Sequence, residues 1–384
     1  MIKIARVDAF AIRVPILEPI KVAFGTFRDR PMVLIRVTDV DGAEGWGETW
    51  SNWPAVGAEH RARLAVDLGQ ALIGKEFGTA EEIFDHLTRE TEVLVLQTGE
   101  VGPVAQVIAG IDIAIWDLHA RKLDEPLCRL LSQKAASHVP VYATGINPDR
   151  PEDFAAARKA EGHRAFKLKI GFGRDLDLQN IAAVRDAIGP EAHFMLDANQ
   201  SLTLPAALDI IELAAKHDIT WLEEPLRVDA ANNDWWLLAE FSSIPLAGGE
   251  NLRGGQFDEW MARGELKFYQ PDITKWGGVT GCMRVARKAV QEGLVYCPHV
   301  FGGGIANLAS LHALAAAGGG GWLELDCHPN AGRELILRDL LPVSDGGVPV
   351  PDAPGLGTSV DLSDFAPFVT WASDNTLATQ RKAG

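Results

Sequence analysis

The spacing of apolar and polar residues divides the chain into two parts that meet near residue 140. In the first 50 residues apolar and polar residues alternate, which predicts strands around 2–14, 32–40 and 44–49 and a turn at Asp41-Gly42. From about residue 59 to residue 131, apolar residues recur at helical spacing, as at Ile108, Ile111 and Ile115. Strands followed by helices predict a compact α+β domain.

Beyond residue 140, short apolar runs alternate with amphipathic helical segments. The runs are VPVYAT, AFKLKIG, HFMLDAN, ITWLEEP, PLAGGEN, KFYQPDI, LVYCPH and GWLELD. Eight strands with helical connections predict a parallel β/α barrel. A doubly wound sheet is the alternative, but it expects a glycine-rich turn after its first strand, and none follows VPVYAT. We therefore predict an α+β capping domain at 1–130, a catalytic barrel at 131–345, and a C-terminal segment at 346–384 that packs back on the cap.

From the second run onward, each predicted barrel strand ends in an ionisable residue. Successive residues are between 22 and 28 positions apart, about one strand-loop-helix-loop unit. A parallel barrel places the C-terminal ends of all its strands on one face, where active sites of this architecture lie. We therefore expect these residues to converge on one pocket. They are Lys169, Asp197, Glu223, Glu250, Asp272, His299 and Glu324.

Three consecutive strand ends, at Asp197, Glu223 and Glu250, supply only carboxylate oxygens. Such a set suits a hard cation, and Mg²⁺ is the predicted cofactor. No HxH or HExxH motif and no cysteine cluster offers a zinc site instead. Glu224 is adjacent, but its spacing fits the series less well, and it is assigned to a structural ion pair.

Two acid/base groups are predicted on separate strands. Lys167 and Lys169 are two positions apart and share one face of their strand, so their mutual repulsion beside a divalent cation should lower the pKa of at least one of them. A lysine with a lowered pKa can act as a general base. His299 follows a strand whose predecessor ends at Asp272, and a carboxylate beside an imidazole supports a second acid/base. Glu324 and Asn199 are predicted to hydrogen-bond substrate oxygens.

Charge and composition exclude several functional classes. The net charge of −16 opposes attraction to nucleic acid and to anionic membranes, so neither is expected as a partner. No run of about 18 consecutive apolar residues predicts a membrane span. Four cysteines without a CxxC pair indicate reduced thiols and a cytoplasmic location.

The motifs at these strand ends resemble those of the enolase superfamily, and within it the mandelate racemase subgroup, over essentially the whole chain. The matching motifs are KLK at 167–169, LDAN at 196–199, LEEP at 222–225, GGEN at 248–251 and PDITKWGG at 271–278, with His299 and Glu324. The resemblance implies a modified (β/α)₇β barrel, Mg²⁺ on Asp197, Glu223 and Glu250, Lys169 as a base, and an Asp272-His299 dyad on the opposite face. The sister muconate-lactonising subgroup carries a lysine where this chain has Asp272.

The resemblance implies removal of a proton α to a carboxylate through an enediolate. A sugar-acid dehydratase that yields a 2-keto acid is the first expectation, followed by a racemase or epimerase and then a lactone cycloisomerase. A metal-dependent aldolase or hydrolase would leave the opposed acid/base pairs without a role, and a noncatalytic binding protein would not need three carboxylates. Lys167, Glu324, Trp53 and Phe24 are further predicted to contact the substrate, and Lys167 and Glu324 to assist catalysis. The expected partners are a small-molecule carboxylate and further copies of the chain, from a dimer to an octamer.

Overall fold

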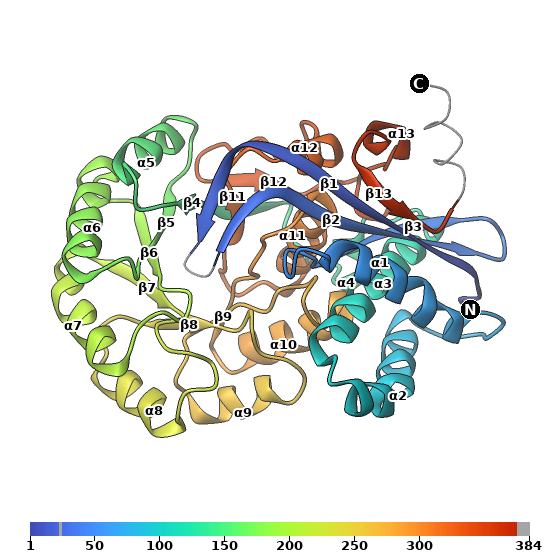
Figure 1. Cartoon of the computed structure of the whole chain (residues 1–384), viewed down its shortest axis with the longest axis horizontal. Helices are drawn as coiled ribbons and strands as arrows, with labels where there is room; N and C mark the ends of the chain where they lie inside the picture. The colour runs from blue at the N-terminus through green and yellow to red at the C-terminus, as the bar shows by residue number, and fades with distance from the viewer. Residues whose placement is uncertain (23–24, 375–384) are drawn as a thin grey trace.

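The structure is a computed structural model that describes residues 1–22 and 25–374. One sheet is antiparallel, with the strand order β13-β1-β2-β3 (Figure 1). Its strands are β1 (Ile4–Val22), β2 (Gly25–Asp39), β3 (Glu44–Thr49) and β13 (Val369–Ala372). The β1–β2 pairing continues to Val22 and Gly25, so the two strands form one long hairpin. Figure 1 shows this hairpin reaching from the cap toward the barrel.

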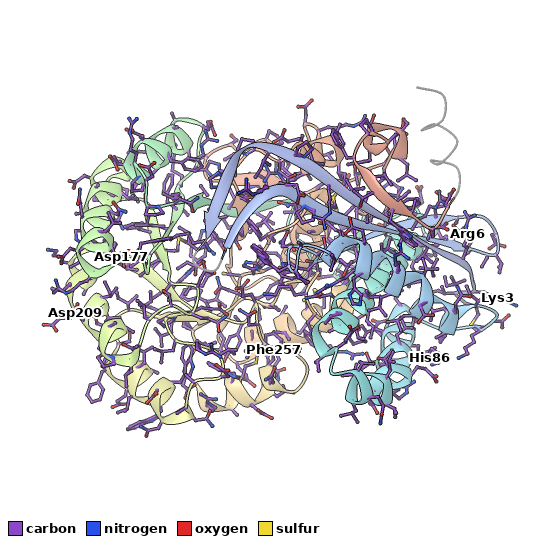
Figure 2. All side chains as sticks on the ribbon, viewed as in Figure 1. Lys3, Arg6, His86, Asp177, Asp209 and Phe257 are labelled. Atoms are coloured by element: carbon purple, nitrogen blue, oxygen red, sulfur yellow. The ribbon has the colours of Figure 1, made fainter. Side chains whose placement is uncertain are left out.

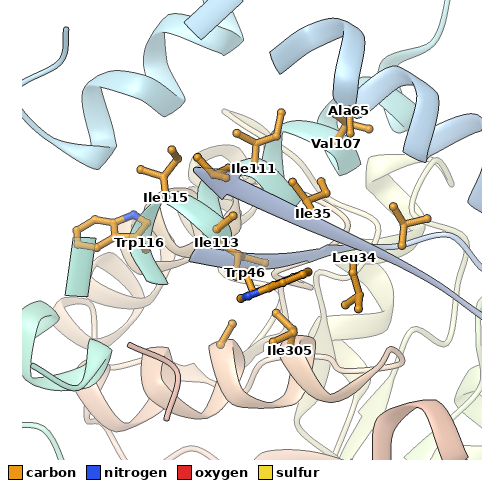
Figure 3. Close-up of a cluster of buried hydrophobic side chains, with 14 of the residues drawn as sticks. Leu34, Ile35, Trp46, Ala65, Val107, Ile111, Ile113, Ile115, Trp116 and Ile305 are labelled. Atoms are coloured by element: carbon orange, nitrogen blue, oxygen red, sulfur yellow. The ribbon is translucent and has the colours of Figure 1, made fainter. Parts of the chain in front are cut away.

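Helices cover one face of this sheet. They are α1 (Gly57–Gly69), η1 (Gln70–Leu72), α2 (Ala80–Thr98), α3 (Val101–Lys122) and α4 (Leu127–Leu131). Helix α3 lies directly on β3, and a Cβ on Gly47 would stand 1.9 Å from the carbonyl oxygen of Gly110, so glycine is required for this approach. The resulting core joins Trp46 and Ile111 to Ile305 of the second domain (Figure 3).

Helix α3 is the one described helix that meets the length and composition of a membrane span. This helix is long and apolar enough by length and composition, but 78% of its apolar window is buried inside the protein, as in the core helix of a globular domain. Asp112 and Asp117 interrupt its apolar residues, so a search for a continuous run misses it.

The second sheet forms the barrel. Its strands follow the order β10-β9-β8-β7-β6-β5-β4-β11, and every neighbouring pair in that series is parallel. Eight strands with seven α-helices between them make a (β/α)₇β barrel, which confirms the predicted fold class. In chain order the elements are β4 (His138–Ile146), α5 (Pro151–Ala160), β5 (Ala165–Lys169), α6 (Arg174–Ile188), β6 (His193–Asp197), α7 (Leu204–Ala214), η2 (Ala215–His217), β7 (Ile219–Glu223), α8 (Asn232–Phe241), β8 (Leu246–Gly248), α9 (Gln256–Arg263), β9 (Phe268–Tyr269), α10 (Gly278–Gln291), β10 (Val295–Tyr296), α11 (Gly304–Ala317) and β11 (Leu323–Asp326).

Contacts between the segments around β10 and β11 close the ring. The backbone N–H of Trp322 lies 3.4 Å from Cys297 Sγ, and the N–H of Val300 donates to Glu324 at 3.0 Å. Side chains then alternate between the barrel interior and the helices outside. Met195 and Trp221 fill the interior, whereas Leu196 and Leu222 pack outward. Charged residues such as Asp209 lie on the outer surface of the helices (Figure 2).

The chain after the barrel contributes to both sheets. It contains α12 (Ala331–Leu337), β12 (Gly347–Pro349), α13 (Leu362–Phe365) and β13. Strand β12 pairs antiparallel with β4 of the barrel, whereas β13 pairs with β1 of the cap. The predicted segment 346–384 therefore joins the barrel first and the cap afterwards. The domain boundaries themselves stay a prediction.

Two buried carboxylates hold the cap at the N-termini of barrel helices. Asp112 of α3 accepts hydrogen bonds from the N–H and the hydroxyl of Thr280 in α10, at 2.9 and 2.7 Å. Glu48 of β3 accepts from the N–H groups of Gly303 and Ala306 at the start of α11. These bonds satisfy backbone donors that a helix start leaves free. Burial nevertheless raises the pKa of both carboxyl groups to about 7.

Candidate active site

A cavity of about 550 Å³ lies at the C-terminal ends of the barrel strands, beneath a cap loop. The wall is formed by residues of β4, β5 and β11, by the turns that follow the barrel strands, and by the loop at 50–54. The lining residues are Trp50, Asn52, Trp53, Pro54, Thr144, Gly145, Asn147, Lys169, Asn199, Gln200, Glu224, Glu250, Asn251, Lys275, His299, Phe301, Glu324 and His328.

The residues predicted for the site fall into three groups. The first group lines the cavity and consists of Lys169, Asn199, Glu250, His299, Glu324 and Trp53. The second group is buried beneath the cavity wall and consists of Lys167, Asp197, Glu223 and Asp272. The third group is Phe24 alone, which lies outside the described residues. The functional roles given to these side chains stay predictions.

Lys167 sits at the centre of a buried cluster of charges. It is fully buried, and its Nζ lies 2.7 Å from Glu223, 2.8 Å from Glu324 and 3.5 Å from Asp197. This position does not support the predicted contact between Lys167 and the substrate. The ammonium instead neutralises carboxylates that would otherwise be buried without a counter-charge.

Lys169 is the lysine that reaches the cavity. Its Nζ donates to Asp197 Oδ2 at 2.5 Å and to Asn199 Oδ1 at 2.9 Å. Burial and the Lys167 charge would lower the pKa of Lys169, but the carboxylates of Asp197 and Glu223 outweigh both, so that pKa is raised. The pKa of Lys167 is likewise raised, despite burial, by Glu223 and Glu324. The carboxylates by themselves thus raise both pKa values, and the lowering predicted for a lysine pair beside a divalent cation stays a prediction.

The predicted metal ligands lie on three consecutive strand ends, and each carboxylate has a donor partner. Asp197 and Glu223 are register neighbours on β6 and β7, and both point into the barrel. Glu223 accepts from Lys167, from Gln270 Nε2 at 2.7 Å and from Trp221 Nε1 at 3.1 Å. Within residues 1–22 and 25–374, no three His, Cys, Asp or Glu side chains are arranged closely enough to enclose an ion as they stand.

The donor set nevertheless fits a hard cation, since it offers only oxygen ligands. Burial raises the pKa of Glu223 to about 7, and the negative charge of Asp197 adds to that rise. Burial, together with the charge of Glu250, likewise raises the pKa of Glu224 well above its usual value. These carboxylates thus carry mutual repulsion that a divalent cation would relieve.

Glu224 does not form the structural ion pair that was predicted for it. It lines the cavity, and its carboxylate accepts from Asn251 Nδ2 at 2.9 and 3.1 Å. None of the described lysines, arginines or histidines is within ion-pair distance of it. The chain turns at this position with a left-handed backbone (φ +41°), which carries the side chain away from the regular strand alternation.

His299 is held between two carboxylates. Its Nδ1 donates to Asp272 Oδ2 at 2.8 Å, and its Nε2 lies 2.8 Å from Glu250 Oε2. Asp272 is itself fixed by the N–H and hydroxyl of Thr274 at 2.8 and 2.7 Å. Burial would lower the pKa of His299, but the charges of Glu250 and Glu324 raise it well above the usual value. The structure therefore favours an imidazolium that can donate a proton into the cavity.

Asn147 and His328 were missed by the sequence analysis, whereas Lys275 was noted there only within the PDITKWGG motif. Asn147 and His328 follow β4 and β11, and their side chains are 3.3 Å apart. Lys275 donates to Asn251 Oδ1 at 2.9 Å and lies over the ring of Trp50, 5.4 Å from its centroid. These residues lie in turns beyond the strand ends, where strand periodicity gives no signal; their positions after predicted strands were the available clue.

Comparison with known proteins agrees with this geometry. A solved structure from Bordetella bronchiseptica RB50, named mandelate racemase/muconate lactonizing enzyme, is 44% identical, has a TM-score of 0.89, and covers 95% of this chain and 98% of its own. A family model for the mandelate racemase / muconate lactonizing enzyme N-terminal domain matches residues 5–132, and an enolase C-terminal domain-like model matches residues 151–364. The chain belongs to the enolase superfamily, in its mandelate racemase subgroup.

Curated relatives in this superfamily act on sugar acids and their lactones. The D-galactarolactone cycloisomerase of Agrobacterium fabrum is 33% identical, over 93% of this chain and 98% of its own length. The arabinonate dehydratase of Saccharolobus solfataricus is 28% identical, over 86% and 89% respectively. Such relatives confirm the prediction of a lyase or isomerase of the enolase superfamily.

A solved enolase-superfamily structure from Bradyrhizobium contains magnesium and mandelic acid. It is 30% identical, has a TM-score of 0.82, and covers 96% of this chain and 99% of its own. A divalent cation and a small carboxylate thus bind together in a protein of the same fold.

Proposed function

We propose that this enolase-superfamily chain is a sugar-acid dehydratase, which removes the proton α to a carboxylate and expels the β-hydroxyl as water. One observation carries the proposal: Lys169 and His299 reach the same cavity from β5 and β10. Around the barrel, two strands (β4 and β11) lie between β5 and β10 in one direction, and four strands lie between them in the other direction. A base and an acid can therefore act on opposite faces of a bound acid.

The residues divide the reaction between them. Lys169, once neutral, takes the α-proton, and the electrons of the C–H bond move into the carboxylate to form an enediolate. His299 then gives its Nε2 proton to the β-hydroxyl, the C–O bond breaks, and water leaves. The resulting enol gains a proton at the β-carbon, loses its O–H proton to solvent, and becomes a 2-keto acid. Glu324 and Asn199 are positioned to hydrogen-bond substrate oxygens during these steps.

Asp197, Glu223 and Glu250 are proposed to hold Mg²⁺. When bound, the ion supplies positive charge that stabilises the enediolate oxygens. The negative charge of Asp197 would then be shared between the ion and Lys169. Lys169 is left beside the fixed ammonium of Lys167, and repulsion between the two lowers the pKa of Lys169 toward that of a usable base.

A lactone cycloisomerase is the second candidate, and the similarity to the Agrobacterium cycloisomerase favours it. Lys169 would again remove the α-proton, but His299 would protonate a ring oxygen as the β C–O bond breaks. No water is released in that case. A racemase would use the same pair without a leaving group, with His299 returning a proton to the opposite face.

A substrate panel tests the proposed function. Purified protein with MgCl₂ is incubated with sugar acids and sugar lactones in D₂O, and α-deuterium and products are followed by NMR, with an EDTA-treated sample as the control. We expect metal-dependent formation of a 2-keto acid with loss of water. Ring opening without water loss would identify the cycloisomerase instead. Absence of α-deuterium from every acid and lactone would reject the enolisation proposal.

We further infer that the chain self-associates through the C-terminal half of α2. Val93 and Leu96 there are 67% and 81% exposed, and Val101 beside them is 45% exposed. An exposed apolar group of this kind is typical of a subunit interface. Leu96→Asp is expected to shift the protein toward the monomer in analytical ultracentrifugation, whereas Leu123→Asp, at a 50% exposed position after α3, should not. A monomeric wild-type protein would contradict this inference.

The cytoplasmic location stays a proposal. It is supported by four cysteines that are all free thiols in the structure.

A further inference from the structure

The wall of the cavity opposite Glu223 and Glu250 is formed by β4 and β11, and β11 also carries Glu324. These two strands are parallel neighbours and lie across the barrel from β7 and β8, where Glu223 and Glu250 are found. Asn147 follows β4, and His328 follows β11 by two residues. The Asn147 amide and His328 Nε2 are 3.3 Å apart, and both residues line the cavity. None of the steps proposed above uses either side chain.

His328 is fixed in place by several contacts. Its backbone N–H donates to Asp326 Oδ1 at 3.0 Å, its carbonyl accepts from Arg333 Nη2 at 3.0 Å, and its ring lies 5.5 Å from that of Phe154. The ring also requires a glycine beneath it. A Cβ on Gly145, whose φ is +89°, would stand 2.6 Å from His328 Cδ2. A residue whose backbone is hydrogen-bonded on both sides and whose ring packs on Phe154 and Gly145 is a preorganised part of the cavity wall.

The pair can bind a hydroxyl whichever way its own hydrogen bond runs. If the Asn147 amide donates to Nε2, the amide oxygen remains as an acceptor and Nδ1–H as a donor. If Nε2–H donates to the amide oxygen, the NH₂ group remains as a donor and Nδ1 as an acceptor. Each arrangement leaves at least one donor and at least one acceptor, which is what a hydroxyl group requires. Trp50, Trp53 and Phe301 in the same cavity add flat apolar surface for the C–H face of a sugar.

Among the side chains that the structure describes, this wall offers no free lysine or arginine to a second carboxylate. Arg30 of the cap and Arg333 both pair with Asp326, and the Arg30 guanidinium lies over the ring of Phe301. None of the described lining residues is an arginine. The lysines among them, Lys169 and Lys275, are bonded to Asp197 and to Glu250 and Asn251.

We propose that Asn147 and His328 form a hydroxyl-binding subsite for the uncharged end of the substrate, so that the enzyme selects monocarboxylates over dicarboxylates. This inference rests on the proposed function and deepens it by naming the substrate class. The reacting carboxylate lies toward β6, β7 and β8, and the remote hydroxyl lies toward β4 and β11. Sugar acids with one carboxylate, and lactones that retain one, satisfy this arrangement.

The experiment uses matched substrates and the intact protein with MgCl₂. For the sugar configuration that shows α-deuterium exchange, kcat/KM is measured for the monoacid, for monodeoxy analogues that each lack one remote hydroxyl, and for the corresponding diacid. In the wild type we expect kcat/KM to be higher for the monoacid than for the diacid. We also expect kcat/KM for the monoacid to be about tenfold or more above that for at least one monodeoxy analogue, because loss of that hydrogen bond leaves a buried partner unsatisfied.

Two variants then locate the effect. In His328→Phe, which retains ring packing on Phe154 without hydrogen bonding, the ratio between the monoacid and that monodeoxy analogue should fall toward one. In His328→Gln, which restores a donor and an acceptor, the ratio should partly recover. An unchanged ratio in His328→Phe, or a wild type that prefers the diacid, would overturn the subsite. Failure of the proposed function differs from both, because no substrate would then exchange its α-hydrogen.

Discussion

His299→Asn is expected to lower formation of keto acid by about 10²–10⁴-fold, the usual contribution of one general acid, while exchange of the α-hydrogen continues. Asparagine has a similar size and can still hydrogen-bond Asp272, but it cannot deliver a proton to the leaving group. With a substrate of the handedness that Lys169 deprotonates, incubation in D₂O should therefore place deuterium at the α-carbon without forming product. With the opposite handedness, for which His299 would be the base, exchange itself should vanish.

Lys169→Met is the matched variant on the other side of the cavity. It retains an unbranched side chain but removes the base, so both α-exchange and keto-acid formation should be lost for the first handedness. Asp272→Asn should resemble His299→Asn in a milder form, because it weakens the 2.8 Å bond to His299 Nδ1 but leaves the ring in place. Wild-type turnover by His299→Asn would show that the opposed acid/base pair is wrong for this enzyme.

Strand periodicity explains why so much of this site was predictable. Within β5, β6 and β7, Leu168, Leu196 and Leu222 pack outward, and the next residue of each strand, at 169, 197 and 223, points inward. Because the strands are parallel and in register, these inward positions converge at one end of the barrel. A repeated polar residue at the end of an apolar run therefore carried enough information to place the charged residues of the site.

The electrostatic balance at the two lysines was not predictable in the same way. Lys167 and Lys169 are neighbours in the sequence, and their mutual repulsion could be inferred from spacing alone. The carboxylates that reverse its effect come from β6, β7 and β11, and Glu324 is more than 150 positions away along the chain. The sign of a pKa shift depends on all charges within a few ångströms, which requires the three-dimensional arrangement.

The subsite at Asn147 and His328 was beyond sequence reasoning for a different reason. Both residues lie in turns, where side-chain direction follows no period of two or of 3.6. Their meeting depends on the left-handed backbone of Gly145 and on contacts between Asp326 and two arginines.

Removing one metal ligand is expected to have the largest effect of all. Glu250→Gln retains the shape of the side chain but removes one anionic oxygen donor, so Mg²⁺ affinity should fall by about 100-fold or more, since changes in outer-shell partners alone cost 10–100-fold. Turnover should be abolished at Mg²⁺ concentrations that saturate the wild type. Titration calorimetry of EDTA-treated, dialysed protein with MgCl₂ measures the affinity without relying on activity. Full turnover by the metal-stripped wild type would contradict the predicted metal dependence.

A matched pair of variants at adjacent positions decides which glutamate of the LEEP motif holds the ion. Glu223 is in register with Asp197 on the inward face, whereas Glu224 lies in the left-handed turn after β7 and bonds Asn251. Because coordination needs carboxylates that converge from adjacent strands, Glu223→Gln should weaken Mg²⁺ binding about as much as Glu250→Gln. Burial and the charge of Glu250 favour the neutral form of Glu224, so Glu224→Gln replaces a group of nearly the same charge and should leave the affinity close to that of the wild type. The reverse result, with Glu224→Gln losing Mg²⁺ and Glu223→Gln keeping it, would move the ligand to the residue that faces the cavity and leave Glu223 as a counter-charge for Lys167.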